Sequence, residues 1–255
     1  MARLITMKET FRFLLYNIRY GTGSGWRFHA PLPFSGYLRK TQKNTSELIN
    51  FIKSQGPDIV GLIEVDGGSR RAEGISQAKQ IADGLGHYFI FNIKYQKPLL
   101  TRHIPIIRRQ GNAFLARDRI LSQQVHYFER GIKRLIIEVE LESIVFFLVH
   151  LSISHRRRKE QLMELAALVK TCNKPVVVGG DFNIFFGIKE LNDFLTATQL
   201  KSANQLNVFT FPSRKPRWEL DFIFHSPEIT VDRIEVLHSR LSDHLPLVCD
   251  FTITS

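Results

Sequence analysis

Short apolar runs rich in Val, Ile and Phe recur along the whole chain, and they constrain its fold more than any other feature. Such runs, bounded by turn residues, are typical of β-strands. Strands are expected over residues 11–18, 58–65, 113–116, 134–141, 144–151, 176–179, 221–224 and 245–251. Within the fourth run, apolar residues alternate with Glu138 and Glu140, which predicts a strand with one solvent-facing side.

Amphipathic helices are expected between several of these runs. Asn44 is expected to cap a helix that buries Leu48 and Ile52 and stops at Gly56. The helical spacing of apolar residues between 75 and 85 predicts a second helix, and a third is expected over residues 156–170. One-sided strands and covering helices favour a four-layer α/β sandwich, in which two mixed sheets pack face to face with helices outside.

The chain is expected to form a single domain over residues 1–255. Its 255 residues, 44% of them hydrophobic, can bury one large core, and no Pro/Gly/Ser-rich linker or repeat divides them. Cys172 and Cys249 are too few for a disulfide framework, and no signal-peptide pattern precedes the first apolar run, so we expect a cytoplasmic protein. The longest apolar run, residues 144–153, is too short to span a membrane.

The positive charge of the chain indicates what it binds. Its 35 Lys and Arg residues exceed its 24 Asp and Glu residues, which gives a formal charge of +11. Such a field attracts polyanions, of which nucleic acid is the natural expectation. An anionic membrane surface would respond to the same charge, and a basic excess alone often serves only to keep a protein soluble. The basic stretch at residues 95–109 is either a substrate-selecting loop near a cleft or a surface excursion without function.

Polar residues interrupt or end several apolar runs, and they are the candidates for chemistry. Each alone has a structural explanation, such as a turn, a helix cap or a surface charge. Together they supply what hydrolysis of a phosphodiester needs: oxygen ligands for a hard cation, a group that orients or deprotonates water, and donors to the phosphate. The set comprises Asn17, Glu64, His150, Asp181, Asn183, Asp221, Asp243 and His244.

Seven segments carry a family resemblance. They are Tyr-Asn-Ile-Arg-Tyr-Gly at 16–21, Gly-Leu-Ile-Glu-Val-Asp at 61–66, Gly-Asn-Ala-Phe-Leu-Ala-Arg at 111–117, Val-His-Leu-Ser at 149–152, Gly-Gly-Asp-Phe-Asn at 179–183, Leu-Asp-Phe-Ile-Phe at 220–224 and Ser-Asp-His-Leu-Pro at 242–246. In this order they resemble the motif series of the endonuclease/exonuclease/phosphatase family, to which deoxyribonuclease I belongs. The resemblance covers nearly the whole chain and implies the same sandwich and a metal-dependent phosphoric ester hydrolase.

The resemblance also implies a metal site. Glu64 resembles the family's principal Mg²⁺ ligand, and Asn17 and Asp243 resemble residues that complete or support the site. Water would fill the remaining positions, as Mg²⁺ prefers, and Mn²⁺ is the alternative cation. The resemblance leaves the number of metal ions open.

Five further residues resemble the family's catalytic groups. Asp181 and Asn183 resemble the pair that positions the attacking water and contacts the scissile phosphate. His244, held by a carboxylate that Asp221 matches, resembles a histidine that stabilises negative charge or acts as general base. His150 resembles a second histidine that donates to the phosphate or to the leaving oxygen. The identity of the general base stays open at this level.

The chain departs from abasic-site endonucleases, which usually carry Gln-Glu-Thr-Lys at residues 63–66 and a Tyr near Arg109. Asn112 and Arg109 are candidate substrate-binding residues; Asn112 could reach a phosphate or serve a turn before the next strand. Arg158 and Gln161 match a recurrent Arg-x-x-Gln that we interpret as structural.

A nuclease acting on DNA or RNA is therefore the leading expectation. The alternative is a lipid-directed phosphatase or sphingomyelinase-like enzyme with the same metal site. In that case Trp26, Phe28 and Phe34 would touch a membrane, although they could equally cover the core. A binding module without activity is disfavoured, because the candidate catalytic residues are all present.

Overall fold

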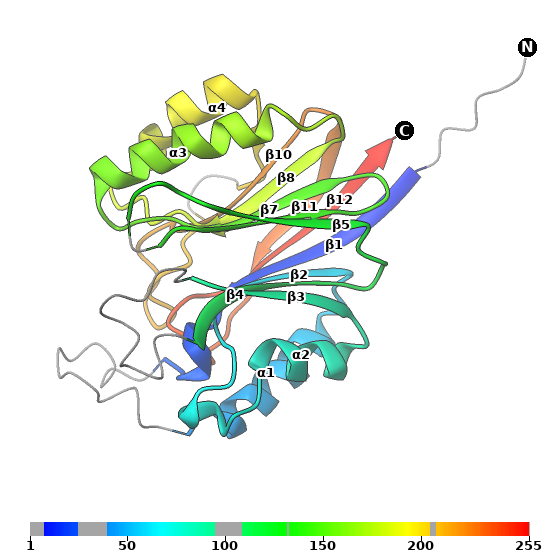
Figure 1. Cartoon of the computed structure of the whole chain (residues 1–255), viewed down its shortest axis with the longest axis vertical. Coiled ribbons are helices and arrows are strands. Elements are labelled where there is room, and N and C mark those ends of the chain that lie inside the picture. Colours follow the sequence, from blue (N-terminus) through cyan, green and yellow to red (C-terminus); the bar gives the residue numbers. More distant parts are fainter. Residues whose placement is uncertain (1–7, 25–39, 95–108, 132, 205–207, 255) are drawn as a thin grey trace, which may run out of the picture.

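A computed structural model describes residues 8–24, 40–94, 109–131, 133–204 and 208–254, which form two six-stranded sheets (Figure 1). Sheet I has the order β11 (Ile229–Val236), β12 (Leu247–Thr254), β1 (Lys8–Asn17), β2 (Ile59–Asp66), β4 (Gln110–Ala116) and β3 (Tyr88–Ile93). Sheet II has the order β5 (Ser122–Tyr127), β6 (Leu135–Glu140), β7 (Val145–His150), β8 (Val176–Asp181), β10 (Asp221–His225) and β9 (Lys201–Ser202).

Each sheet contains one parallel pair among antiparallel neighbours. In sheet I, β1 runs parallel to β2 with Asn17 opposite Ile63, next to Glu64. In sheet II, β7 runs parallel to β8 with His150 opposite Asp181. Since parallel strands end at the same edge of a sheet, the polar residues that terminate them are brought together.

The core between the sheets is built around phenylalanine. The ring of Phe146 lies 5.4 Å from that of Phe13 and 5.2 Å from that of Phe114, and all three side chains are buried. A Cβ atom at Gly179 would lie 2.9 Å from the Phe13 ring, and one at Gly61 would lie 3.2 Å from it. The two glycines therefore make room for Phe13, on opposite sheets.

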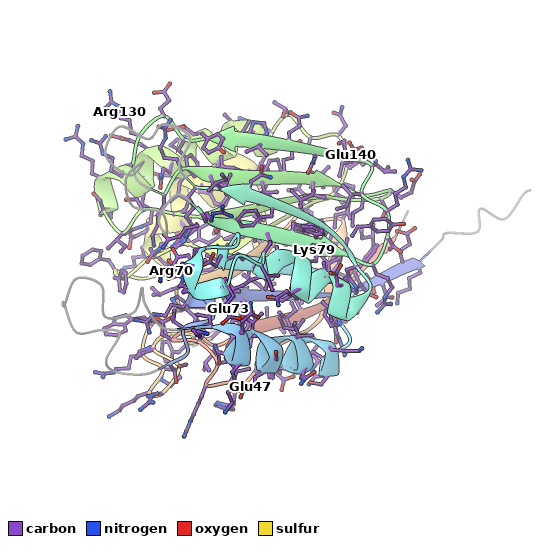
Figure 2. The ribbon with its side chains drawn as sticks, turned by 60° about the horizontal axis from the view of Figure 1, so that its bottom comes forward. Glu47, Arg70, Glu73, Lys79, Arg130 and Glu140 are labelled. Carbon is purple, nitrogen blue, oxygen red and sulfur yellow. The ribbon has the colours of Figure 1, made fainter. Side chains whose placement is uncertain are left out.

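Helices cover the outer face of each sheet (Figure 1). Helices α1 (Gln42–Ser54) and α2 (Gln77–Leu85) pack their buried side chains, such as Leu48 and Ile81, on sheet I. Helices α3 (His155–Val169) and α4 (Asn192–Thr198) cover sheet II. Figure 2 shows Glu47 on α1 and Lys79 on α2 among the side chains of the outer surface. The four-layer α/β sandwich is confirmed.

Three short 3-10 helices complete the described structure, at Arg19–Gly21, Arg70–Ala72 and Ile188–Leu191. All eight expected strands are present with shifted ends. Within the described ranges, no helix is long and apolar enough to cross a membrane.

Two expectations about helix starts are wrong. α1 begins at Gln42 after Thr41, so Asn44 lies inside the helix and does not cap it. Its Nδ2 instead donates to the carbonyl oxygens of Gly21, at 2.8 Å, and Leu241, at 3.0 Å, which ties α1 to two loops. Ile75 precedes α2 and is exposed, because Ser76 caps this helix by accepting a hydrogen bond from the backbone N–H of Lys79.

Candidate active site

Asp181, the last residue of β8, lies at the centre of the predicted site and is 2% exposed. Its Oδ2 accepts a hydrogen bond from Asn17 Nδ2 at 3.1 Å, and lies 3.2 Å from His150 Nε2 and 3.9 Å from His244 Nε2. Its Oδ1 accepts from the backbone N–H of Asn183 at 3.1 Å. Three predicted site residues that are distant in sequence, Asn17, His150 and His244, thus converge on one carboxylate.

The strand register of sheet II explains this convergence. Asp181 on β8 faces His150 on β7 and Asp221 on β10, so the three residues lie side by side across the sheet. Asn183 follows in the left-handed region, with φ 53°, and its Nδ2 donates to the Leu151 carbonyl oxygen at 3.0 Å. The Asn183 side chain thereby joins the loop after β8 to the loop after β7.

His244 is held as a charged imidazolium between two carboxylates. Its Nδ1 lies 2.7 Å from Asp221 Oδ2, which also accepts a hydrogen bond from Thr210 Oγ1 at 2.5 Å. Burial alone would lower the pKa of His244, but Asp221 and then Asp181 outweigh burial and raise the pKa to about 10. His244 is therefore a hydrogen-bond donor near neutral pH.

His150 has the opposite electrostatic environment. Its Nδ1 lies 3.2 Å from Lys94 Nζ, and its Nε2 lies against Lys133 Nζ as well as Asp181. Burial, followed by the charges of Lys133 and Lys94, lowers the pKa of His150 to about 3. The two site histidines therefore differ in charge, His150 being neutral and His244 positive.

Glu64 is turned toward the site by a bulge in β2. The β2–β4 register shifts between Leu62 and Val65, and Glu64 has a positive φ of 58°. Its Oε1 lies 3.7 Å from Lys94 Nζ and 3.9 Å from His150 Nδ1. Burial would raise the pKa of Glu64, but the charge of Lys94 is the largest of several that overcome it and lower the pKa to about 2. Glu64 is therefore ionised.

The predicted metal ligands supply hard oxygen donors. Asn17 Oδ1 accepts from the backbone N–H of Arg19 at 3.1 Å, and Asp243 Oδ2 lies 3.3 Å from Arg19 Nε. With the ionised Glu64, these amide and carboxylate oxygens have the chemistry that Mg²⁺ prefers. Arg19 thus links two of the three predicted ligands, Asn17 and Asp243.

A second group of donors could also hold a metal ion. Ligand atoms of Asp181, Asp221 and His244 all lie within 4.8 Å of one another, and the three residues are buried. Asp221 Oδ1 is buried without a hydrogen-bond partner in the part of the chain that the structure describes. His244 Nδ1 is already hydrogen-bonded to Asp221, which leaves Nε2 as the ring nitrogen that could face a metal ion.

Sequence reasoning missed Lys94 and Lys133. The side chain of Lys94 is 3% exposed, and its Nζ lies 3.3 Å from the Tyr20 hydroxyl, close to Glu64 and His150. Burial lowers the pKa of Lys94 to about 8, although Glu64 opposes this. Lys94 directly follows β3, so its signal in the sequence was a charged residue at a strand end.

Arg158 and Gln161 have the expected structural role. The buried Arg158 donates from Nη1 to the carbonyl oxygens of Ser152 and Ile153, each at 2.9 Å, and pairs with Glu190. Gln161 Oε1 accepts from the backbone N–H of Ser152 at 2.8 Å, and its Nε2 donates to the carbonyl oxygen of Lys133 at 2.7 Å. Together they fix the loop after His150 and the segment that carries Lys133.

Asn112 lies within β4 and is fully buried, so the turn interpretation is wrong. Its Oδ1 accepts from the backbone N–H of Glu64 at 3.3 Å, which supports the bulge. Among the described residues its Nδ2 has no hydrogen-bond partner. Arg109 is exposed, and its carbonyl oxygen accepts from the Gly67 N–H at 2.7 Å; the described contacts do not join Arg109 to the other site residues.

Two other expectations lie outside the described residues. They concern the basic stretch up to residue 108 and the aromatic residues Trp26, Phe28 and Phe34.

Solved structures share this architecture at low sequence identity. An endonuclease/exonuclease/phosphatase family protein from Bacteroides thetaiotaomicron has a TM-score of 0.73 and 16% identity, covering 97% of this chain and 96% of its own. The human Nocturnin catalytic domain has a TM-score of 0.69 and 20% identity, covering 98% of both. A mannosyl-6-phosphatase from Bacteroides thetaiotaomicron VPI-5482 has a TM-score of 0.71 and 17% identity, covering 94% of this chain and 99% of its own.

At such identities the structural likeness shows the fold alone, and no curated protein matches the chain in sequence. The family model described as Endonuclease/Exonuclease/phosphatase family, however, matches residues 14–244. That span includes all the residues that converge on Asp181. The chain therefore belongs to the endonuclease/exonuclease/phosphatase family, whose members are phosphoric ester hydrolases.

Proposed function

We propose that the protein is a Mg²⁺-dependent phosphodiester hydrolase that acts on nucleic acid. The observation that carries the proposal is the convergence of Asn17, His150 and His244 on Asp181 Oδ2. A carboxylate placed between two imidazoles of different charge is suited to orient a water molecule for in-line attack. The family membership supports the reaction class, and the +11 charge supports a polyanionic substrate.

In this proposal Glu64 is the principal metal ligand, and Asn17 and Asp243 complete or support the site. We assign Asp181, Asp221 and His244 to catalysis instead, because Asp181 Oδ2 accepts a hydrogen bond from Asn17 and faces both imidazoles. A bound Mg²⁺, or Mn²⁺, would neutralise charge on the phosphate oxygens.

Side chains of the protein orient the attacking water and bind the phosphate. Asp181 orients the attacking water, and Asn183 contacts the scissile phosphate. The imidazolium of His244 donates to a phosphoryl oxygen, where negative charge develops in the transition state. On the other side of Asp181, the neutral His150 and the ammonium of Lys94 would face the phosphate or the leaving oxygen.

A phosphomonoester is the second candidate substrate, for example a phosphorylated lipid head group. The observation that favours it is the pair of lysines, Lys94 and Lys133, both of which contact His150. A monoester carries more negative charge than a diester, and two ammonium groups would stabilise that extra charge. The fold neighbour described as a mannosyl-6-phosphatase is compatible with this alternative.

The test compares wild type with His244→Ala, in Mg²⁺ or in EDTA. The substrates are supercoiled plasmid, single-stranded RNA, bis-p-nitrophenyl phosphate and p-nitrophenyl phosphate. Lys79→Ala, on the outer face of α2, is the control. We expect metal-dependent cleavage of a polynucleotide and of the diester, lost in His244→Ala and kept in Lys79→Ala. Turnover of the monoester with both polynucleotides intact would favour the second candidate, and no turnover of any substrate would contradict both.

A further inference from the structure

A row of aromatic rings leads outward from the catalytic centre. The ring of Phe211 lies 4.8 Å from that of His244, and the ring of Trp218 lies 6.1 Å from that of Phe211. The ring of Phe185 follows, 6.0 Å from that of Trp218. Phe185 lies on the loop after β8, and Phe186 comes next in the chain on the same loop.

Two aromatic residues of this region, Trp218 in the row and Phe186 next to it, are exposed to solvent. The ring of Phe186 lies 6.1 Å from that of His155, the first residue of α3. Phe186 is 78% exposed and Trp218 is 37% exposed. Exposed apolar groups that are gathered together and rimmed by polar residues are typical of interaction sites.

The segments that hold these rings carry excess positive charge. Besides the buried Arg158, which pairs with Glu190, residues 153–160 contain three Lys or Arg, residues 186–190 one and residues 209–218 three. The other acidic residue in these segments is Glu160. The Arg217 guanidinium lies over the Trp218 ring, 5.6 Å from its centroid. Cations interleaved with exposed rings form a surface for a chain of phosphates that carries planar groups.

We propose that this aromatic row binds the bases of a single-stranded polynucleotide as it enters the catalytic centre. The inference rests on the proposed function and narrows its substrate class. Duplex DNA does not fit, because its bases stack on one another and leave no free faces for Phe186 or Trp218. A bilayer fits less well, because the row leads to His244, which is 6% exposed and beyond the reach of a membrane surface.

The test measures binding without turnover. Fluorescence anisotropy of a fluorescein-labelled dT15 and of a labelled 15-base-pair duplex is recorded in EDTA for wild type and variants. Phe186→Leu keeps an apolar side chain but removes the ring, and Phe186→Trp restores a ring. Phe89→Leu is the matched control, because Phe89 is an aromatic residue on β3 that is 40% exposed.

The expected result is that Phe186→Leu weakens dT15 binding at least about fivefold, that Phe186→Trp restores it and that Phe89→Leu leaves it unchanged. Duplex binding should change less than twofold in every variant. Equal effects on strand and duplex, or none on either, would overturn the inference. So would wild type binding anionic phosphatidylserine vesicles, in a flotation assay, more tightly than dT15, with Phe186→Leu retaining the vesicle binding.

Turnover of bis-p-nitrophenyl phosphate separates this inference from the proposed function. Wild type that binds dT15 as expected but cleaves no diester would contradict the proposed function and keep the binding surface. Normal diester turnover by wild type, with no effect of Phe186→Leu on dT15 binding, would keep the proposed function and contradict the binding surface.

Discussion

His244 Nδ1 lies 2.7 Å from Asp221 Oδ2, in a hydrogen bond that is buried from solvent. This carboxylate is the largest influence that opposes burial and raises the pKa of His244. The positive charge of the His244 imidazole therefore depends on its pairing with Asp221. The same pairing decides whether His244 can donate to a phosphate.

Asp221→Asn should therefore lower the pKa of His244 from about 10, because it removes the largest influence that opposes burial. A titration of the histidine ring resonances by NMR, without metal, measures the change. An unchanged His244 titration in the variant would contradict the assignment.

The same pair makes the stability of the protein depend on pH. The folded-state pKa of His244, about 10, exceeds the ordinary value of 6.5. Its contribution to the free energy of unfolding is then complete below about pH 6.5 and is lost as the pH rises through about 10. In urea unfolding between pH 6.5 and 10, wild type should lose more stability than His244→Gln. Parallel losses in both proteins would argue against this linkage.

Glu64→Gln should weaken Mg²⁺ or Mn²⁺ binding at least about tenfold, because it removes the ionised ligand. Isothermal titration calorimetry measures this without turnover, and Asp221→Asn is the comparison. If Asp221→Asn abolished metal binding while Glu64→Gln retained it, the metal would instead belong to the group of Asp181, Asp221 and His244.

Lys94→Met should lower kcat/KM for p-nitrophenyl phosphate by about ten- to hundredfold, as expected for loss of a hydrogen bond to a charged group. The effect on bis-p-nitrophenyl phosphate should be smaller, because the diester carries less charge. Methionine preserves the length and most of the volume of the buried side chain. Equal losses on both substrates would indicate that Lys94 only positions Glu64 and His150.

Gly179→Ala should destabilise the fold by about 1–3 kcal/mol, because the added Cβ would lie 2.9 Å from the Phe13 ring in a closely packed core. Chemical unfolding measures this loss. Gly74→Ala, where a Cβ would meet nothing within 4 Å, is an informative contrast because only its positive φ of 82° opposes the substitution. Wild-type stability in Gly179→Ala would show that the two sheets can separate locally at no cost.

The sequence predicted the layers because buried strands leave continuous apolar runs. Edge strand β5 (Ser122–Tyr127) was not among the expected strands, since three of its six residues are exposed and none is buried, which leaves a weak pattern. Asn44 is of a residue type that often caps helices, but its hydrogen-bond partners, Gly21 and Leu241, are far away in the sequence. Local sequence patterns carry no information about such tertiary hydrogen bonds.

The site residues differ in the same way between those that a local sequence pattern indicates and those that only a tertiary contact places there. His150 and Asp181 end apolar runs, so their positions were predictable, and the parallel register then places them side by side. Lys133 lies before β6 in a basic segment, where nothing local distinguishes it from solvent-exposed lysines. Its contact with His150 depends on Gln161, which holds the Lys133 carbonyl from another element.

The most direct test of the account is the turnover of bis-p-nitrophenyl phosphate by Asp181→Asn in saturating Mg²⁺. The substitution keeps the shape of the side chain but removes the charge on which Asn17, His150 and His244 converge. We predict a loss of kcat of at least about a hundredfold with a folded protein by circular dichroism. Wild-type kcat in Asp181→Asn would contradict the central claim.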